Sequence, residues 1–300
     1  MKKNLIIGTA TGYKYAQMQY FFTSLKDIDF QGDIVILVSD GIDPETEKEL
    51  TEQGVIPIYI KEKAIQFTKK YANSRLWKIH YLPHKLLFAM LNAGGDKIRR
   101  LGNYVKRFHL ISGSRYCFYY DYLVANKDKY QYVLLTDVRD VVFQADPFAG
   151  LNQTDVLNFY EEENTIEKSF YTSYWIKHAF GAKALDRIKE KMSICSGTTI
   201  GSVNRILKYL ENMIVTQARI TAGLTGLGGF DQGVHNYLIY NNYFPGARVI
   251  ANTDAEVATL GESTSIWFND EKELVNRDKK VIPVVHQFDR FPEMKLKALA

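Results

Sequence analysis

The sequence has few cysteines, few prolines and no long apolar run, and each absence excludes a class of protein. Among 300 residues there are only 2 cysteines and 7 prolines. Two cysteines cannot form the disulfide framework of a small secreted domain, and so few prolines argue against long disordered tracts. No apolar run approaches the roughly 20 residues of a membrane span. Met1–Thr11 holds only a short apolar run, so we expect no signal peptide and predict a cytoplasmic protein, with peripheral contact at the inner membrane face left open.

A strong excess of one charge is also missing. Lysine and arginine number 38 against 34 acidic residues, which gives a formal net charge of +4. This balance does not indicate a nucleic-acid partner. Basic residues do gather at Lys97–Arg100 and Lys106–Arg107. A solvated face explains them most simply, and a docking surface for an anionic membrane or polymer is the alternative.

Apolar and aromatic residues are plentiful. Apolar types make up 46% of the chain, enough for a substantial core, and there are 20 tyrosines and 17 phenylalanines. Core packing accounts for most of these rings, and sugar-stacking surfaces are the second interpretation. A length of 300 residues allows one large domain or two small halves.

Strand and helix patterns alternate along the first sixty residues. Short apolar runs at Asn4–Gly8, Asp33–Val38 and Val55–Ile60 predict buried strands. Helical spacing marks Tyr15–Leu25, and Asp43–Gln53 begins with the Asp-Pro-Glu of a capped helix. Alternation of this kind predicts a parallel sheet with crossover helices.

The rest of the chain continues the α/β pattern. Further strands are predicted at Tyr132–Thr136, Asp155–Phe159 and Val281–Val285, and further helices at Leu86–Asn92, Tyr116–Asn126, Asn204–Arg219 and Asp231–Tyr240. We expect a solvated loop at Glu161–Glu163 and a flexible loop at Gly223–Gly229. The predicted fold is an α/β domain over residues 1–300, whose mixed, mostly parallel central sheet is flanked by helices. Only Val142–Leu151 suggests a soft divide between two halves.

Polar segments follow three of the predicted strands. Gly8–Tyr13, Asp40 and Asp137–Asp140 each stand where an apolar run ends. Ligands of open α/β sheets bind beyond the carboxyl ends of the strands, so the three segments predict one binding site. Carboxylates at the end of a buried strand are costly unless they are paired or hold a cation. A divalent cation takes such oxygen ligands and commonly shares them with substrate phosphates.

The segment around Asp137 resembles a known family. It is similar to the GT-A glycosyltransferases, which use nucleotide sugars, and specifically to the branch with glycogenin and the bacterial lipopolysaccharide galactosyltransferases. In that branch an Asp-x-Asp motif follows an apolar strand and an Asp-Pro element trails it, as Asp146-Pro147 does here. The resemblance implies a GT-A, Rossmann-like fold, with 1–150 as the nucleotide-binding half and 151–300 as the acceptor-side half.

The motif departs from the family at its third position. Residues i and i+2 of a strand share a face, but Arg139 stands two after Asp137, and the next acid is Asp140. Asp140 can join Asp137 on one ion if the chain turns after the strand. Alternatively Asp137 binds the metal with His286 while Asp140 pairs with Arg139, or no metal binds and Arg139 serves the diphosphate. An ion-paired turn without a ligand is the structural interpretation.

A late histidine strengthens the resemblance. His286 follows the apolar run Pro283–Val285, and a lone histidine in such a place is usually structural. The family branch takes its third metal ligand from a histidine just after a C-terminal strand, which implies His286 here. Imidazole suits Mn²⁺ better than Mg²⁺, so the implied ion is Mn²⁺, with Mg²⁺ as the alternative.

Two further segments match the sugar-binding part of that branch. The resemblance implies that Asp231 holds hydroxyls of the donor sugar and that Gln232 lies opposite the leaving diphosphate; a helix cap by Asp231 is the structural alternative. Ser196 and Gly197 match an Asn-(Ala/Ser)-Gly segment that contacts the sugar. Cys195 stands in the Asn place, and we interpret it as a buried thiol.

The remaining predicted contacts face the donor nucleotide. Asp40 is a candidate for the base or ribose. Arg115, near the start of the helix before the motif strand, is a candidate for neutralising the diphosphate, with a surface ion pair as the alternative. The loop after the first strand is expected to face the base and ribose through Thr9, Ala10, Thr11 and Tyr13.

The sequence therefore predicts a metal-dependent glycosyltransferase. It would move a hexose or pentose from a nucleoside diphosphate donor, UDP by preference, to the hydroxyl of a glycan or lipid-linked acceptor, as in polysaccharide biosynthesis. The resemblance implies retention of anomeric configuration. Two alternatives remain: a sugar-1-phosphate nucleotidyltransferase and a non-catalytic glycan-binding protein. The dinucleotide fingerprint and the P-loop are absent from the sequence, which disfavours NAD and P-loop chemistry.

Overall fold

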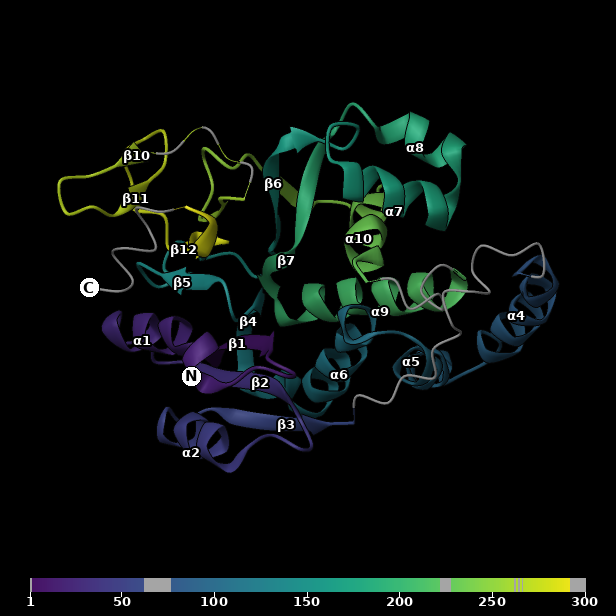
Figure 1. Cartoon of the computed structure of the whole chain (residues 1–300), viewed down its shortest axis with the longest axis horizontal. Coiled ribbons are helices and arrows are strands. Elements are labelled where there is room, and N and C mark those ends of the chain that lie inside the picture. Colours follow the sequence, from purple (N-terminus) through teal and green to yellow (C-terminus); the bar gives the residue numbers. More distant parts are fainter. Residues whose placement is uncertain are drawn as a thin grey trace.

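The computed structural model describes residues 2–61, 77–221, 228–261, 263, 265 and 267–291. Its centre is a seven-stranded sheet with the order β3-β2-β1-β4-β7-β6-β8 (Figure 1). The strands are β1 (Lys3–Thr9), β2 (Asp33–Ser39), β3 (Ile56–Ile60), β4 (Tyr130–Asp137), β6 (Leu157–Thr165), β7 (Met192–Ser202) and β8 (Arg248–Ile250). β7 runs antiparallel to both β4 and β6, and the other neighbours pair in parallel. The sheet is therefore mixed and mostly parallel, as predicted.

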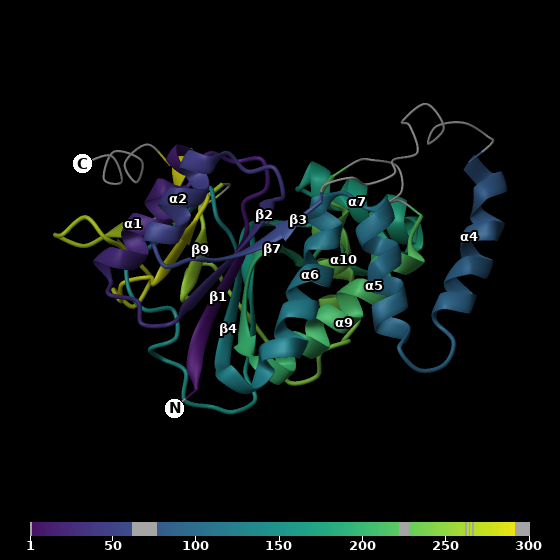
Figure 2. The same cartoon turned by 90° about the horizontal axis from the view of Figure 1, so that it is seen from below.

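Helices cover both faces of this sheet (Figure 2). One face packs on α1 (Gln19–Asp27) and α2 (Pro44–Glu52); the other packs on α5 (Lys97–Phe108), α6 (Ile111–Asn126) and α9 (Val203–Arg219). Strand periodicity explains the division, because successive side chains point to opposite faces. In β1, Ile6 joins the α1 side, while Leu5 and Ile7 join the α6 side.

Smaller elements complete the molecule. A three-stranded sheet with the order β5-β12-β9 joins β5 (Val141–Phe143), β12 (Val284–His286) and β9 (Val257–Thr259). Beyond it lies the pair β10 (Trp267–Phe268) and β11 (Leu274–Val275). The remaining helices are α4 (Trp77–Leu91), α7 (Phe170–Phe180), α8 (Ala182–Ile188), α10 (Phe230–Tyr240) and the short η1 (Tyr15–Gln17), η2 (Lys127–Lys129) and η4 (Phe288–Arg290). Among the described residues, none of the helices combines the length and apolar character needed to cross a bilayer.

The predicted strands of the first half are confirmed, and so is the cap of α2. Asp43 accepts a hydrogen bond from the Thr46 amide at 3.0 Å, as expected of an N-cap aspartate. The predicted helix Tyr15–Leu25 is interrupted, because η1 ends at Gln17 and α1 begins at Gln19. The helix predicted from Tyr116 begins five residues earlier, at Ile111. Residues 223–227 of the predicted loop Gly223–Gly229 lie outside the described residues.

The loop predicted at Glu161–Glu163 is wrong, because β6 continues through it to Thr165. Glu161 still pairs with Ile194 of β7, with an irregularity in the strand register on each side of it. The Glu163 carboxylate accepts hydrogen bonds from the Ser263 hydroxyl at 2.6 Å and the Ser265 amide at 3.2 Å. These distant partners satisfy the acid and allow the strand to continue.

Candidate functional site

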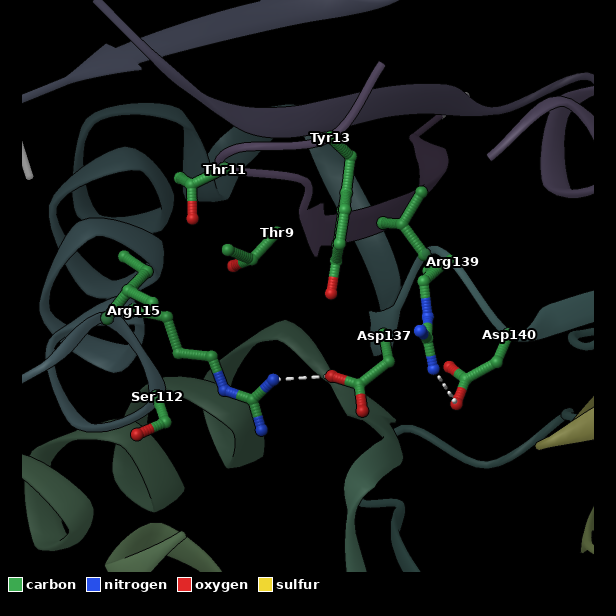
Figure 3. Close-up of a pocket in the computed structure, with 10 residues that line it drawn as sticks. Thr9, Thr11, Tyr13, Ser112, Arg115, Asp137, Arg139 and Asp140 are labelled. Carbon is green, nitrogen blue, oxygen red and sulfur yellow. Dashed lines mark hydrogen bonds and ion pairs between the residues drawn. The ribbon is translucent and has the colours of Figure 1, made fainter. Parts of the chain in front are cut away.

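A pocket of about 320 Å³ opens at the carboxyl ends of β1 and β4 (Figure 3). Three segments line it: the loop after β1, the first turns of α6 and the turn after β4. The lining residues are Thr9, Thr11, Tyr13, Ile111, Ser112, Arg115, Asp137, Val138, Arg139 and Asp140. Its position agrees with the rule for open α/β sheets, and its volume falls in the range of small-molecule sites.

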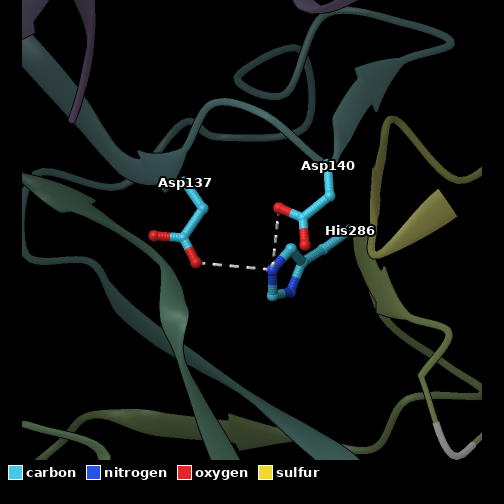
Figure 4. A group of neighbouring side chains, drawn as sticks. All are labelled: Asp137, Asp140 and His286. Atoms are coloured by element: carbon cyan, nitrogen blue, oxygen red, sulfur yellow. Dashed lines mark ion pairs between the residues drawn. The ribbon is translucent and has the colours of Figure 1, made fainter. Parts of the chain in front are cut away.

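Three predicted metal ligands meet beside this pocket (Figure 4). The Nε2 atom of His286 lies 3.6 Å from Oδ2 of Asp137 and 3.8 Å from Oδ1 of Asp140. One ligand atom of each residue lies within 4.8 Å of the other two. Two carboxylates and one imidazole therefore share a small space, although they come from opposite halves of the chain.

Local backbone structure explains this convergence. Asp137 is the last residue of β4, and the chain then turns at Val138–Asp140 before β5 begins. His286, the last residue of β12, pairs with Val141 of β5. The turn supplies the change of direction that Asp140 needed to join Asp137. The small sheet brings the histidine to both acids.

The residues present fit a divalent cation. Two carboxylates and an imidazole are donors that Mn²⁺ accepts. The opposite ring nitrogen of His286, Nδ1, lies 3.4 Å from Sγ of Cys195 and 3.4 Å from Oγ1 of Thr259. These two contacts orient the ring so that Nε2 faces the acids, which is how a second layer of partners positions a histidine ligand.

A glycine in β7 leaves room for the cluster. A Cβ atom at Gly197 would stand 2.7 Å from Oδ2 of Asp137 and 2.8 Å from Cε1 of His286. Real side chains almost never approach so closely. The structure thus places the predicted Gly197 directly against two of the predicted ligands.

Arg115 lies at the centre of a buried ionic network. Its Nη1 lies 2.5 Å from Oδ1 of Asp137, and its Nη2 lies 2.9 Å from Oδ2 of Asp231. The same Nη2 lies 3.3 Å from the carbonyl oxygen of Ser196, and the Ser196 hydroxyl lies 3.4 Å from Oδ2 of Asp231. Arg115, Asp231 and Ser196 therefore join the segments predicted to bind sugar to the candidate metal-ligand cluster.

Arg115 and His286 favour the ionised carboxylates of this network, whereas burial and the neighbouring acids oppose ionisation. Burial opposes ionisation of Asp137, but the Arg115 guanidinium and His286 hold the pKa of its carboxyl well below its usual range. Burial raises the pKa of Asp231 and of Asp140, an effect partly offset by Arg115 and His286 respectively. Ionised Asp137 is thus the firmest negative charge at the pocket.

Asp231 and Gln232 point to different places. Asp231 is 5% exposed and joins Arg115, whereas the Gln232 amide nitrogen lies 3.2 Å from Oγ1 of Thr172 and 3.3 Å from a Glu162 oxygen. The N-cap of α10 is Gly229, so Asp231 is not the cap that the structural alternative required.

The other predicted contacts lie at different depths. Ala10 is buried in the apolar layer on the α1 side, and Asp40 is exposed at the end of β2; neither is among the residues that line the pocket. Arg139 lies at the pocket with its Nη2 3.8 Å from Asp140 and 3.7 Å from Asp289. Asp140 thus faces both His286 and Arg139, which combines two of the arrangements that the sequence left open.

Several contacts at the site were missed by sequence reasoning. Ile111 and Ser112 line the pocket because α6 begins earlier than predicted. Thr259 contacts His286 from β9, a short strand for which no prediction was made. The early start of α6 is the one of these that a helix pattern in 111–116 could have revealed.

Comparison with known proteins adds no relative. No protein-family model matches the chain, and none of the curated proteins matches it significantly.

Proposed function

We propose that the chain is a metal-dependent glycosyltransferase of the GT-A type that uses a nucleoside diphosphate sugar, UDP-linked by preference, as donor. The acceptor would be a hydroxyl of a glycan or lipid-linked sugar. One observation carries the proposal: Asp137, Asp140 and His286 converge within 4.8 Å beside a pocket at the carboxyl ends of β1 and β4. Acids alone at a strand end are common, but an imidazole brought to them from the far end of the chain suits a cation.

The pocket has the chemistry of a nucleoside diphosphate site. Figure 3 shows the Tyr13 side chain reaching into the space between Thr9 and Asp137, where a base or ribose would lie. Arg115 and Arg139 stand on either side of Asp137, and guanidinium groups suit phosphate oxygens. Mn²⁺ or Mg²⁺ held by Asp137, Asp140 and His286 would act as a Lewis acid that neutralises the departing diphosphate.

The chain's own residues would hold the reacting sugar. Ser196 and Asp231 both contact Nη2 of Arg115 and lie within hydrogen-bond distance of each other. Their hydroxyl and carboxylate oxygens can orient sugar hydroxyls. Burial raises the pKa of Asp231 and Arg115 offsets part of that rise; the same guanidinium would face the charge that develops on the diphosphate.

Turnover of nucleotide sugars tests the proposal. We expect the purified protein to hydrolyse at least one UDP-sugar slowly with Mn²⁺ and not after chelation. Turnover of a sugar-1-phosphate with a nucleoside triphosphate would instead favour a nucleotidyltransferase. Glycan binding without donor turnover would favour a non-catalytic protein.

The variant Asp137→Asn tests whether the charge of Asp137 is needed for Mn²⁺-dependent donor binding. The amide keeps the size of the side chain but removes the charge that pairs with Arg115 and would face the ion. We expect Mn²⁺-dependent UDP affinity, measured by titration calorimetry, to fall at least about tenfold, while circular dichroism stays native. Unchanged UDP affinity in the presence of Mn²⁺ would contradict the assignment.

A further inference from the structure

Two rows of aromatic rings run along α7. Phe170, Tyr174 and His178 form one row at four-residue spacing, and Tyr171 and Trp175 form the other. Rings stack within each row: the centroids are 6.3 Å apart for Phe170 and Tyr174, 3.9 Å for Tyr174 and His178, and 5.7 Å for Tyr171 and Trp175. The interplanar angles of these pairs lie between 24° and 29°.

The outer rings Phe170, Tyr171 and His178 are exposed, whereas Tyr174 and Trp175 are half-buried and pack against the core. Thr172 and Ile176, on the opposite side of α7, are fully buried. Phe170 is 74% exposed and Tyr171 is 65% exposed, the first and third most exposed of the large apolar and aromatic side chains among the described residues. Exposing adjacent rings is unfavourable in water, and such patches mark binding surfaces.

The middle of the two rows, at Tyr174 and Trp175, lies beside the candidate site. The ring of Trp175 covers Gly229, where an added Cβ would stand only 2.0 Å from its Cζ2 atom. Tyr174 lies near Phe230, with ring centroids 6.5 Å apart. Asp231 is the next residue, and it contacts Arg115 in the pocket wall. α7 and α10 lie side by side, as Figure 1 also shows.

We propose that the rings of α7 form the acceptor subsite and bind the sugar rings of an oligosaccharide; this rests on the proposed function. A pyranose presents C–H groups on one face and hydroxyls at its rim. The C–H face suits the negative face of an aromatic ring, and the Tyr171 hydroxyl and Trp175 N–H can bond the hydroxyls. An acceptor seated there would extend from Asp231 outward along α7.

A second exposed apolar patch, on α4, lacks the aromatic rings that would make it suitable for binding a carbohydrate. On α4, Leu82, Leu86 and Met90 stand at four-residue spacing and are 59–73% exposed. Those side chains are aliphatic, and they lack both the ring quadrupole and the polar tips. The α7 surface, in contrast, combines flat rings with hydrogen-bonding groups, which a carbohydrate needs.

Oligosaccharide binding without donor tests the subsite. Lactose, N-acetyllactosamine, maltotriose and cellotriose are titrated by calorimetry, and the emission of Trp175 is followed in a protein whose other two tryptophans are phenylalanine. We expect at least one sugar to bind and to shift that emission. Tyr171→Ala should weaken its binding between about two- and tenfold. Tyr59→Ala, an exposed tyrosine on β3 at the far edge of the sheet, should not.

The outcomes separate the two proposals. The subsite is overturned if none of the sugars binds at 20 mM (about the weakest affinity that matters). It is also overturned if wild type and Tyr171→Ala bind a sugar equally well. Both conclusions hold even if UDP-sugar turnover is found. Adsorption to phosphatidylcholine vesicles that depends on Tyr171, without sugar binding, also overturns it. Tyr171-dependent sugar binding without UDP-sugar turnover keeps the subsite and rejects the transferase. Where an acceptor is turned over, Tyr171→Ala should raise its KM more than it lowers kcat.

Discussion

At the residue scale, the candidate metal centre depends on Gly197 having no side chain. Gly197 lies on β7 where the strand passes directly against Asp137 and His286. Any Cβ there overlaps a carboxylate oxygen on one side and an imidazole carbon on the other. Other contacts fix both side chains: Arg115 pairs with Asp137, and Cys195 and Thr259 contact the ring of His286. Neither side chain can therefore move away easily from an added Cβ.

Gly197→Ala should therefore damage the cluster without removing any ligand. We expect Mn²⁺ affinity, measured by calorimetry, to fall about 10- to 100-fold, as when groups around a metal ligand are disturbed. Gly41→Ala is the control, because a Cβ there meets no atom within 4 Å and its φ is not positive. Equal Mn²⁺ affinity in the two folded variants would contradict this role for Gly197.

His286 supplies a pH dependence with a definite sign. Burial lowers the pKa of its imidazole, but Cys195, Asp137 and Asp140 outweigh burial and raise the pKa well above its usual value. The raised pKa favours the protonated form of His286 in the metal-free protein. A metal needs the lone pair at Nε2, so the proton competes with the ion, and metal affinity rises with pH up to that raised pKa.

We accordingly expect Mn²⁺ binding at pH 7 to release about one proton per ion. Calorimetry in buffers of different ionisation enthalpy measures this release, and titrations from pH 6 to pH 8 should show tighter binding at the higher pH. His286→Gln, which has no titrating imidazole, should lose the release. Binding that is independent of buffer and pH in the wild type would show that His286 is not a ligand.

At the element scale, the ion pair between Arg115 and Asp231 fastens α6 to α10. Its two atoms lie 2.9 Å apart, and both side chains are nearly buried. Tyr116 strengthens the link, because its hydroxyl lies 3.3 Å from Oδ2 of Asp231. The pair thus links α6, which lines the pocket, to α10, which carries Asp231 and Gln232, the residues proposed to bind the sugar.

Asp231→Asn tests this link through stability. The variant keeps the shape but loses a charged hydrogen bond in a buried place, so the free energy of unfolding should fall by about 1.5–3 kcal/mol. Urea unfolding at pH 7 measures the change. Asp186→Asn is the control: its exposed carboxylate lies 3.7 Å from Lys189, and the loss should stay below about 0.5 kcal/mol. An equally small loss for Asp231→Asn would reject the fastening role.

The elements also show what local sequence can predict. The interior of β2 is apolar throughout, so its pattern clearly predicts a buried strand. Asp43 caps α2 by accepting a hydrogen bond from the amide of Thr46, only three residues further along the chain. The continuation of β6 through Glu161–Glu163 depends on partners a hundred residues away, such as Ser263, and no local window contains them.

The candidate site also has some features that the sequence predicts and others that depend on tertiary packing. The strand-end position of Asp137 follows from the sequence, and the resemblance to a family proposed His286 as its partner. The link from Arg115 to Asp231, and the separate partners of Gln232, depend on how α6, α7 and α10 pack. Side-chain packing between distant helices leaves no spacing pattern in the chain.

At the scale of the whole molecule, one sheet joins the two predicted halves. β4 of residues 1–150 pairs along Tyr132–Thr136 with β7 of residues 151–300. The apolar layer beneath Val133 and Leu135 is shared, because Ile206 and Leu210 of α9 belong to the same buried cluster. The candidate metal ligands divide likewise, with Asp137 and Asp140 in residues 1–150 and His286 in residues 151–300.

We therefore expect residues 1–150 alone not to fold cooperatively, although they contain the lining of the pocket. Without β7 and α9, β4 becomes an unpaired edge and its apolar side chains face water, an arrangement that promotes association. Urea unfolding followed by circular dichroism should show no sigmoidal transition, and gel filtration should show aggregates. Co-expression with residues 151–300 should restore a soluble complex, because it returns the missing strand and helix. A monomeric 1–150 fragment with a cooperative transition would show instead that the nucleotide-binding half is an independent unit, and the shared sheet would then be an interface between two domains.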